Sequence, residues 1–209
     1  MLKKLEPGSY YGTTERRYDL GGLTVAESVF PPGLVIPPHE HTNAFFCLLL
    51  EGCCTTSLDQ RTWTGMPLTL VLFPAGLAHA NRWHDAGGRA LNVEFAHPWL
   101  ERLRGRTTVL ERPADYEGGP LVWLAGRLCE ECRRQDDVSP LAVEGLALEL
   151  VAECSRSRVE ATPSPSPRDR EHSARSSSTS PSAARGETSS GRRHSPTSRL
   201  ASQIGGPPW

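Results

Sequence analysis

Short apolar runs separated by turn-forming residues fill the first hundred positions of this 209-residue chain. The run 44–50, AFFCLLL, contains no polar residue, which is typical of a strand that is buried on both faces or lines a closed barrel. The apolar segments 23–30, 66–76 and 87–96 are also short, and proline, glycine or polar residues separate them. This spacing predicts a mainly β fold, an antiparallel β-barrel or sandwich.

The pattern becomes helical after the predicted strands. Residues 97–105 are predicted to form a short helix, and 119–135 and 139–158 are the clearest helical segments, because their large apolar residues recur on one face. Ser139 is predicted to cap the last helix, with Pro140 at its first position. Two or three helices are therefore expected to follow the barrel.

The end of the chain has a different composition. Residues 155–209 contain 15 serines, 7 prolines and 9 arginines but very few large apolar side chains, so they cannot bury enough surface to offset the entropy of ordering. We therefore divide the chain into a barrel at 1–100, a helical dimerisation or linker segment at 101–158, and a disordered Ser/Arg/Pro-rich tail at 159–209.

Two histidines one residue apart are the strongest chemical signal. In a strand, His39 and His41 project from the same face, and His79 follows the end of another predicted strand. If the two strands are neighbours, three imidazoles converge on one point and form a site for Zn, Fe, Ni or Cu. His84 is expected at the rim, with a role as a substitute ligand as the alternative.

The spacing of these residues resembles the cupin motif. Gly-x5-His-x-His ending at His41 resembles its first half, and Pro-x-Gly-x2-His ending at His79 resembles its second half. The chain departs from the motif in three places. The usual glutamate position falls at Phe45 or Phe46, and the usual asparagine falls at Trp83, although Asn81 is near. The glycine that opens the second half falls at Leu68.

The segments HTNAFFCLLLEG, FPAGLAHANRW, GGRALNVEF and SPLAVEGLALELVAE together resemble the N-terminal half of AraC-type transcription regulators. The resemblance implies a cupin barrel that binds a small-molecule effector or mediates dimerisation, with a pocket that includes Phe45, Phe46, Asn81 and Trp83. It also implies a homodimer formed through the barrel or the helices, and helix-turn-helix units further along the chain.

The sequence after 158 does not have the pattern of a helix-turn-helix half. The abrupt change to Ser, Arg, Pro and Gly suggests a shift of reading frame, so specific DNA binding is expected only if an intact DNA-binding half exists. The basic tail is expected to give at most non-specific, salt-sensitive affinity for nucleic acid.

A stand-alone metal-dependent cupin enzyme, of the dioxygenase or isomerase type, is the alternative. The helices and the missing glutamate favour a sensor without catalytic residues. No signal peptide and no apolar run of about 18 residues is visible, so a cytoplasmic protein with reduced thiols and no membrane partner is expected. Cys129 and Cys132 share a helical face and are interpreted as packing residues, because structural zinc requires four ligands.

Overall fold

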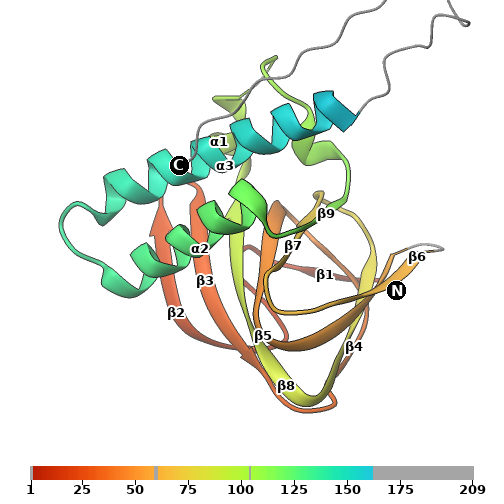
Figure 1. Ribbon diagram of the computed structural model, residues 1–209. Coiled ribbons are helices and arrows are strands. Elements are labelled where there is room, and N and C mark those ends of the chain that lie inside the picture. The colour runs from red at the N-terminus through yellow and green to blue at the C-terminus, as the bar shows by residue number, and fades with distance from the viewer. Residues whose placement is uncertain (1, 59–60, 104, 162–209) are drawn as a thin grey trace, which may run out of the picture. The chain divides into compact units, whose positions relative to one another are not determined.

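The computed structural model of the chain describes residues 2–58, 61–103 and 105–161. In this part of the chain, eight strands precede the first α-helix, and a ninth short strand lies before the two long helices (Figure 1). In chain order the elements are β1 (Lys3–Leu5), β2 (Thr13–Leu20), β3 (Leu23–Phe30), β4 (Val35–His41), β5 (Ala44–Leu58), β6 (Arg61–Gly65), β7 (Thr69–Phe73), β8 (His79–Phe95), α1 (His97–Glu101), a 3₁₀ turn (Val109–Glu111), β9 (Ala114–Glu117), α2 (Gly119–Arg134) and α3 (Ser139–Ala161).

The two longest strands, β5 and β8, run antiparallel and side by side. Their pairing extends from Ala44 opposite Phe95 to Ser57 opposite Ala80. β8 also pairs with β4 near its start and with β3 along its second half, whereas β5 pairs first with β7 and then with β6. The two strands therefore belong to both halves of one sheet, which curls over on itself (Figure 1).

The sheet bends where Gly52 of β5 lies opposite Gly88 of β8. Gly52 has a φ of +82°, and a Cβ atom there would lie 2.0 Å from the carbonyl oxygen of Gly87. A Cβ atom at Gly88 would lie 2.2 Å from the ring of Trp83. The strands can approach this closely because glycine occupies these positions, and the register shifts on both sides of Gly52 add to the bend.

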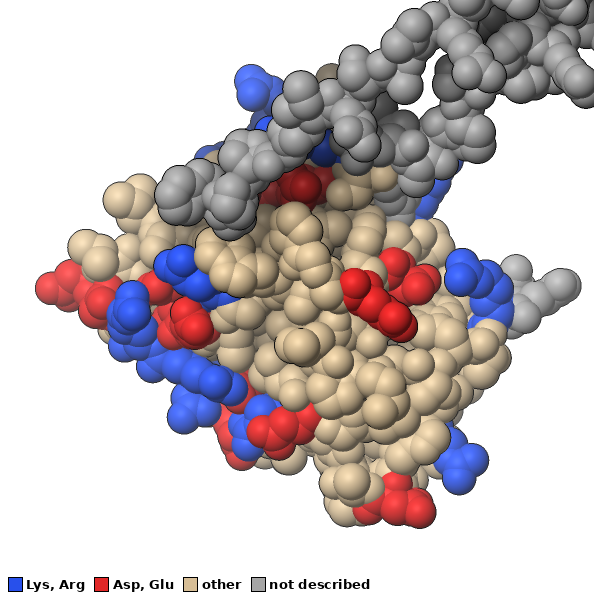
Figure 2. All heavy atoms as spheres, viewed as in Figure 1, with Lys and Arg blue, Asp and Glu red and all other residues tan. Residues whose placement is uncertain are grey.

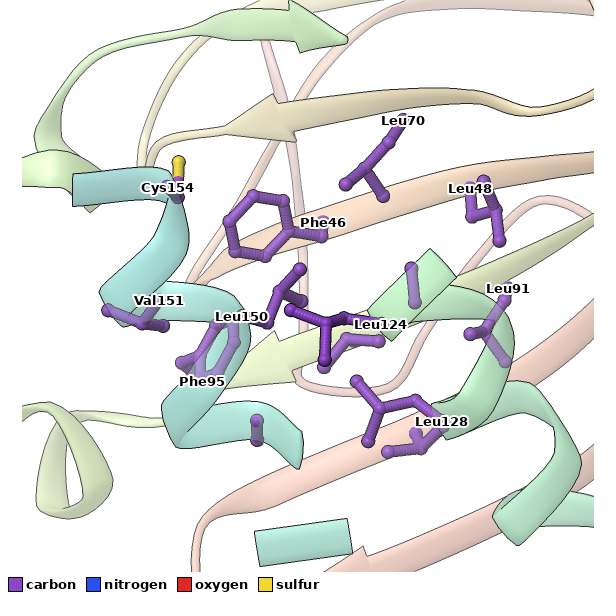
Figure 3. Close-up of a cluster of buried hydrophobic side chains, with 14 of the residues drawn as sticks. Phe46, Leu48, Leu70, Leu91, Phe95, Leu124, Leu128, Leu150, Val151 and Cys154 are labelled. Atoms are coloured by element: carbon purple, nitrogen blue, oxygen red, sulfur yellow. The ribbon is translucent and has the colours of Figure 1, made fainter. Parts of the chain in front are cut away.

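The first half of β5 is buried on both faces. Phe45, Cys47 and Leu49 line a cavity between the halves of the sheet, whereas Phe46 and Leu48 face the helices. This explains the unbroken apolar run, because alternate side chains enter two different apolar environments. Figure 3 shows part of the helix-facing core, with Phe46, Leu48, Leu70, Leu91 and Phe95 of the sheet against Leu124, Leu128, Leu150, Val151 and Cys154 of the helices.

The start of α3 differs from the sequence prediction. The carboxylate of Asp136, rather than the hydroxyl of Ser139, accepts the free amides, with distances of 3.1 Å from Val138 N and 3.0 Å from Ser139 N. Ser139 is fully buried and donates its hydroxyl to Glu131 at 3.1 Å. The cap therefore lies one turn earlier than expected, and the serine joins α3 to α2 instead.

A buried carboxylate attaches α2 to the sheet. Glu27 of β3 is fully buried and accepts two hydrogen bonds from Arg133, at 2.9 and 2.7 Å, and one from Arg89 of β8 at 2.9 Å. The hydrogen bonds from Arg133, with help from Arg89, hold the pKa of Glu27 below its usual 4.5. The ionised network therefore stabilises the docked helix above that pH, and the stabilisation is lost as the pH falls below it.

Most features of the predicted fold are confirmed: a mainly β fold with helices after it, and helical segments at each of the three expected places. The sheet is antiparallel as predicted, except that the three-residue strand β1 pairs with β4 in parallel. α3 continues to Ala161, and the rest of the predicted tail lies outside the described residues. The division of the chain at 100 and 158 stays a prediction. Among the described helices, none has the length and apolar character needed to cross a membrane.

Replacing Arg133 with Met is expected to lower the free energy of unfolding by about 2–3 kcal/mol near neutral pH, because two charge-assisted hydrogen bonds to a buried carboxylate are lost. The difference from the wild type should shrink as the pH falls below about 4.5, where Glu27 becomes protonated. Urea denaturation across this pH range measures both effects. Arg127→Met, which removes an exposed ion pair on the same helix, is the control and should change stability by less than about 1 kcal/mol. An equal loss in both variants would contradict the role given to Glu27.

Leu68 lies in a backbone conformation that suits glycine. It has a φ of +70° in the turn between β6 and β7, and its side chain is 59% exposed. Leu68→Gly is expected to stabilise the protein by about 0.5–1 kcal/mol, since relief of the left-handed strain exceeds the entropy gained by the unfolded chain. Met66→Gly in the same turn, where φ is negative, should destabilise it instead. The melting temperatures of both variants test this prediction. A change of the same sign in both would contradict the backbone strain assigned to Leu68.

Candidate metal centre

The cavity between the two halves of the sheet has a volume of about 50 Å³. Aromatic and aliphatic side chains form most of its wall, and its polar lining consists of histidine, tyrosine, asparagine, threonine and cysteine. No Asp, Glu, Lys or Arg of the described chain is among the lining residues. The interior is therefore polar in places but carries no formal charge while its histidines are neutral.

Three histidines converge on one side of this cavity. His39 and His41 project from the same face of β4, and His79, the first residue of β8, lies opposite His39 in the sheet register. Their side chains are buried, and one nitrogen from each lies within 4.8 Å of the others. The ring centroids of His39 and His79 are 4.3 Å apart. The structure thus brings together the three residues that the sequence predicts as metal ligands.

Backbone carbonyls fix the orientation of two of the rings. His39 Nδ1 donates to the carbonyl of Pro37 at 2.9 Å, and His79 Nδ1 donates to the carbonyl of Leu77 at 3.0 Å. In both rings Nε2 is then the atom that carries the free lone pair. Second-shell bonds of this type orient imidazoles in metal sites. His41 Nδ1, by contrast, is a buried atom without a hydrogen-bond partner in the described chain.

Burial keeps the three imidazoles neutral. It lowers the pKa of His41 to about 3, with a further contribution from the neighbouring His79 and His39, and it lowers the pKa of His79 to about 4. Burial also lowers the pKa of His39. A neutral imidazole is the form that binds a metal ion, so the site needs no deprotonation near pH 7.

The donor set fits a transition metal. Three imidazole nitrogens with open positions suit Zn, Fe, Ni or Cu, whereas Mg and Ca prefer oxygen ligands. The unpartnered Nδ1 of His41 is a buried polar atom whose need for a partner a metal ion would satisfy. His39, His41 and His79 would hold the ion, which would supply Lewis acidity for the binding of a small molecule.

The structure separates the two phenylalanines that replace the usual glutamate. Phe45 faces the cavity, with its ring centroid 4.5 Å from that of His41 and 6.1 Å from that of His79. Phe46 lies on the opposite face of β5 and packs into the helix-facing core, so its predicted place in the pocket is wrong. The reason is the alternation of side chains along a strand, which sends neighbours to opposite faces. Of the two phenylalanines, Phe45 is thus the one that faces the histidines.

Asn81 and Trp83 line the cavity as expected. His84 is exposed and does not line the cavity; its Nε2 forms a hydrogen bond of 2.8 Å with Thr55, and it is not part of the histidine cluster. Asn92 and Cys47 also line the cavity but were not predicted. The signal that could have found Asn92 is a polar residue between Leu91 and Val93 in the apolar segment 87–96. Leu91 and Val93 face the helices, so Asn92 faces the cavity.

An N-terminal arm, residues 6–11, lies against the histidines. The sequence did not predict this contact. Tyr10 lies 5.7 Å from His41 between ring centroids, and Tyr11 lies 5.1 Å from His39. The buried carboxylate of Glu94 holds the arm, because it accepts hydrogen bonds from Gly8 N at 2.8 Å and Tyr10 Oη at 2.9 Å. Burial and the nearby Glu94 raise the pKa of Tyr10, so its hydroxyl remains a donor.

Glu94→Gln is expected to loosen this arm. The amide keeps the shape but removes the negative charge, so the bonds from Gly8 and Tyr10, which share one carboxylate oxygen, lose their charge assistance even where that oxygen is retained. A hydrogen bond to a charged group contributes about 1.5–3 kcal/mol, against about 1 kcal/mol for a neutral one. Hydrogen exchange measured by mass spectrometry should become faster in residues 6–11. Glu40→Gln, on the outer face of β4, is the control and should leave exchange unchanged. Unchanged exchange in the Glu94 variant would show that other contacts hold the arm.

The chain matches the family described as AraC-like ligand binding domain over residues 25–151, which is more than half of its length. No curated protein matches the chain. Among solved structures, the AraC-like transcriptional activator CuxR is 16% identical, with a TM-score of 0.47 over 67% of this chain and 54% of that one.

Two further solved structures are similar over a smaller part of the chain. A protein of unknown function from Rhizobium leguminosarum is 26% identical and has a TM-score of 0.37, covering 38% of this chain and 76% of that one. A cupin superfamily protein from Desulfitobacterium hafniense is 15% identical and has a TM-score of 0.38, covering 44% and 84%. The family match spans the strands that carry the histidines, the cavity and most of both long helices, and the chain belongs to the family of AraC-like ligand binding domains.

Proposed function

We propose that this barrel senses a small molecule at a metal ion held by His39, His41 and His79, as the effector-binding part of an AraC-type regulator. The convergence of three buried, neutral imidazoles beside a small cavity carries this proposal. The family match supports the sensing role, because it covers a ligand-binding domain. The metal ion supplies a point of attachment for an effector that the apolar walls alone would bind weakly.

The shared strands offer a route from the cavity to the helices. Phe45 contacts the histidines, and its neighbour Phe46 packs in the core that includes residues of α2 and α3. A displacement of β5 on effector binding would therefore change the packing under both helices, since interiors packed at this density transmit small shifts.

We also propose that the helices form the dimer interface. Trp123 of α2 is 59% exposed, and Leu141 of α3 is 79% exposed, although both are large apolar side chains. Tryptophan is enriched at the centres of protein interfaces, and an exposed leucine adds apolar area next to such a centre only if both lie on one face. The barrel remains the alternative dimerisation surface.

Specific DNA binding would require a helix-turn-helix half, and the matched family covers the ligand-binding domain. On the face shown in Figure 2, basic side chains lie at the edges next to acidic ones, around a broad uncharged area. Such a face is not an electrostatic footprint for nucleic acid. This face therefore gives no support for direct contact with DNA, and the family match is the ground for assigning the described residues to effector sensing.

A metal-dependent cupin enzyme is the second candidate. One observation favours it. Catalytic metal sites also have three protein ligands and leave a coordination position of the metal open for water or substrate. Turnover would distinguish the two functions. Steady oxygen consumption by the iron-loaded protein, or isomerisation of a substrate, would favour the enzyme, whereas saturable binding without turnover is the behaviour of a sensor.

Metal analysis of untagged protein tests the site. The wild type is expected to bind about one transition-metal ion per chain, and His79→Ala should weaken binding at least about 10-fold, because one of three ligands is lost. His84→Ala, at an exposed histidine outside the cavity, is the matched control and should bind as the wild type does. Absence of metal after incubation with Zn, Fe, Ni and Cu, or equal binding by both variants, would contradict the proposed centre.

A further inference from the structure

The cavity contains nothing to balance the charge of a bound metal ion. This inference rests on the proposed metal site. The three imidazoles are neutral ligands, Phe45 stands where a carboxylate ligand would be, and no described residue with a formal charge lines the cavity. A divalent ion on these ligands places two positive charges in an interior of low polarity, which is costly unless an anion accompanies it.

The nearest buried carboxylate is already engaged. Glu94 accepts hydrogen bonds from Gly8 and Tyr10 of the arm, and Asn43 Nδ2 donates to its second oxygen at 2.8 Å. Its carboxylate lies outside the cluster of ligand atoms formed by the histidines. Turning Glu94 towards the metal would break all three hydrogen bonds, so the balancing charge has to come from outside the protein.

The cavity holds free donors for an oxygen atom. The side chain of Asn92 is 2% exposed, and its Nδ2 has no hydrogen-bond partner in the described chain; the same holds for Nε1 of Trp83. Buried donors normally have partners, so unpaired donors beside a cavity can bond to a water molecule or to the acceptor atoms of a ligand that enters it. The amide of Asn81 is already bonded to Thr56.

The volume limits the size of this ligand. A water molecule needs about 10–15 Å³ of such space, so a cavity of about 50 Å³ holds about three to five atoms of that size. Phe45 and Phe73, stacked at 4.9 Å between ring centroids, form one wall of the cavity. Without movement of these side chains, the space favours a ligand of a few non-hydrogen atoms over a sugar or an aromatic acid.

We propose that the effector is a small carboxylate, of the size of formate or acetate, which provides the anionic ligand that the protein itself lacks. One carboxylate oxygen completes the shell of the metal held by His39, His41 and His79. The amide of Asn92 donates to the ligand, and the aromatic walls exclude larger acids.

Cobalt-substituted protein tests the proposal, because the visible spectrum of Co²⁺ responds to its ligands. Acetate is expected to change the spectrum with saturation, whereas the neutral isostere acetamide should bind at least about 10-fold more weakly, since it cannot balance the charge. Benzoate should fail to bind, since it exceeds the cavity; binding at an open, solvent-exposed ion would not discriminate by size.

Two variants supply the missing charge within the protein. Asn92→Asp is nearly isosteric and should retain Co²⁺ but lose acetate affinity by at least about 10-fold, because its own carboxylate balances the ion. Phe45→Glu places a carboxylate beside His41 and should bind Co²⁺ more tightly with the same loss of acetate binding. Circular dichroism checks that each variant is folded, and the comparison of acetate with acetamide on the wild type stands without them.

The outcomes separate this inference from the function on which it rests. Failure of the wild type to bind Co²⁺ would overturn both. Binding of Co²⁺ without a response to acetate, or with an equal response to acetamide or benzoate, would overturn the carboxylate proposal and leave the metal centre in place. Undiminished acetate affinity in folded Asn92→Asp would also overturn it.

Discussion

The pairing of β5 with β8 is the constraint on which the other features depend. These strands remain side by side through the bend at Gly52 and Gly88, so the same two strands form the wall of the cavity and the floor under the helices. His79 begins β8 and meets β4 because β8 also pairs with that strand. A side chain at Gly52 or Gly88 would meet the opposite strand or the ring of Trp83 and would force the two strands apart at the bend.

Charge is distributed around the cavity rather than within it. Glu94 lies beside the arm and Glu27 lies under α2, and each is satisfied by several donors. The cavity between them holds neutral polar groups, some of which have no partner in the described chain. A protein interior tolerates paired charges at its margins more readily than an unpaired one inside. A metal ion bound by the three histidines would therefore need an anionic ligand from solution to balance its charge.

Much of the fold could be predicted from the sequence because its periodicities are strong, and the spacing of His39 and His41 placed both imidazoles on one face of a strand. The sequence could not distinguish Phe45 from Phe46, because both faces of β5 are apolar and alternation is then invisible. Tyr10 and Tyr11 were not predicted, since the arm has no repeating pattern and reaches the cavity through long-range contacts. The cap by Asp136 was not predicted because two polar residues near a helix start compete for the same amides.

The sheet register also has a kinetic consequence. Leu23 of β3 lies opposite Phe95 of β8, so chain segments far apart in sequence must meet before the central strands are complete. Closing such long loops costs entropy before any contact is gained, and domains rich in non-local pairing fold slowly for this reason. The apolar faces of α2 and α3 have no surface to cover until that pairing exists. During synthesis α2 and α3 would emerge after the strands of the barrel, onto a sheet that still exposes its apolar face, and this interval favours aggregation.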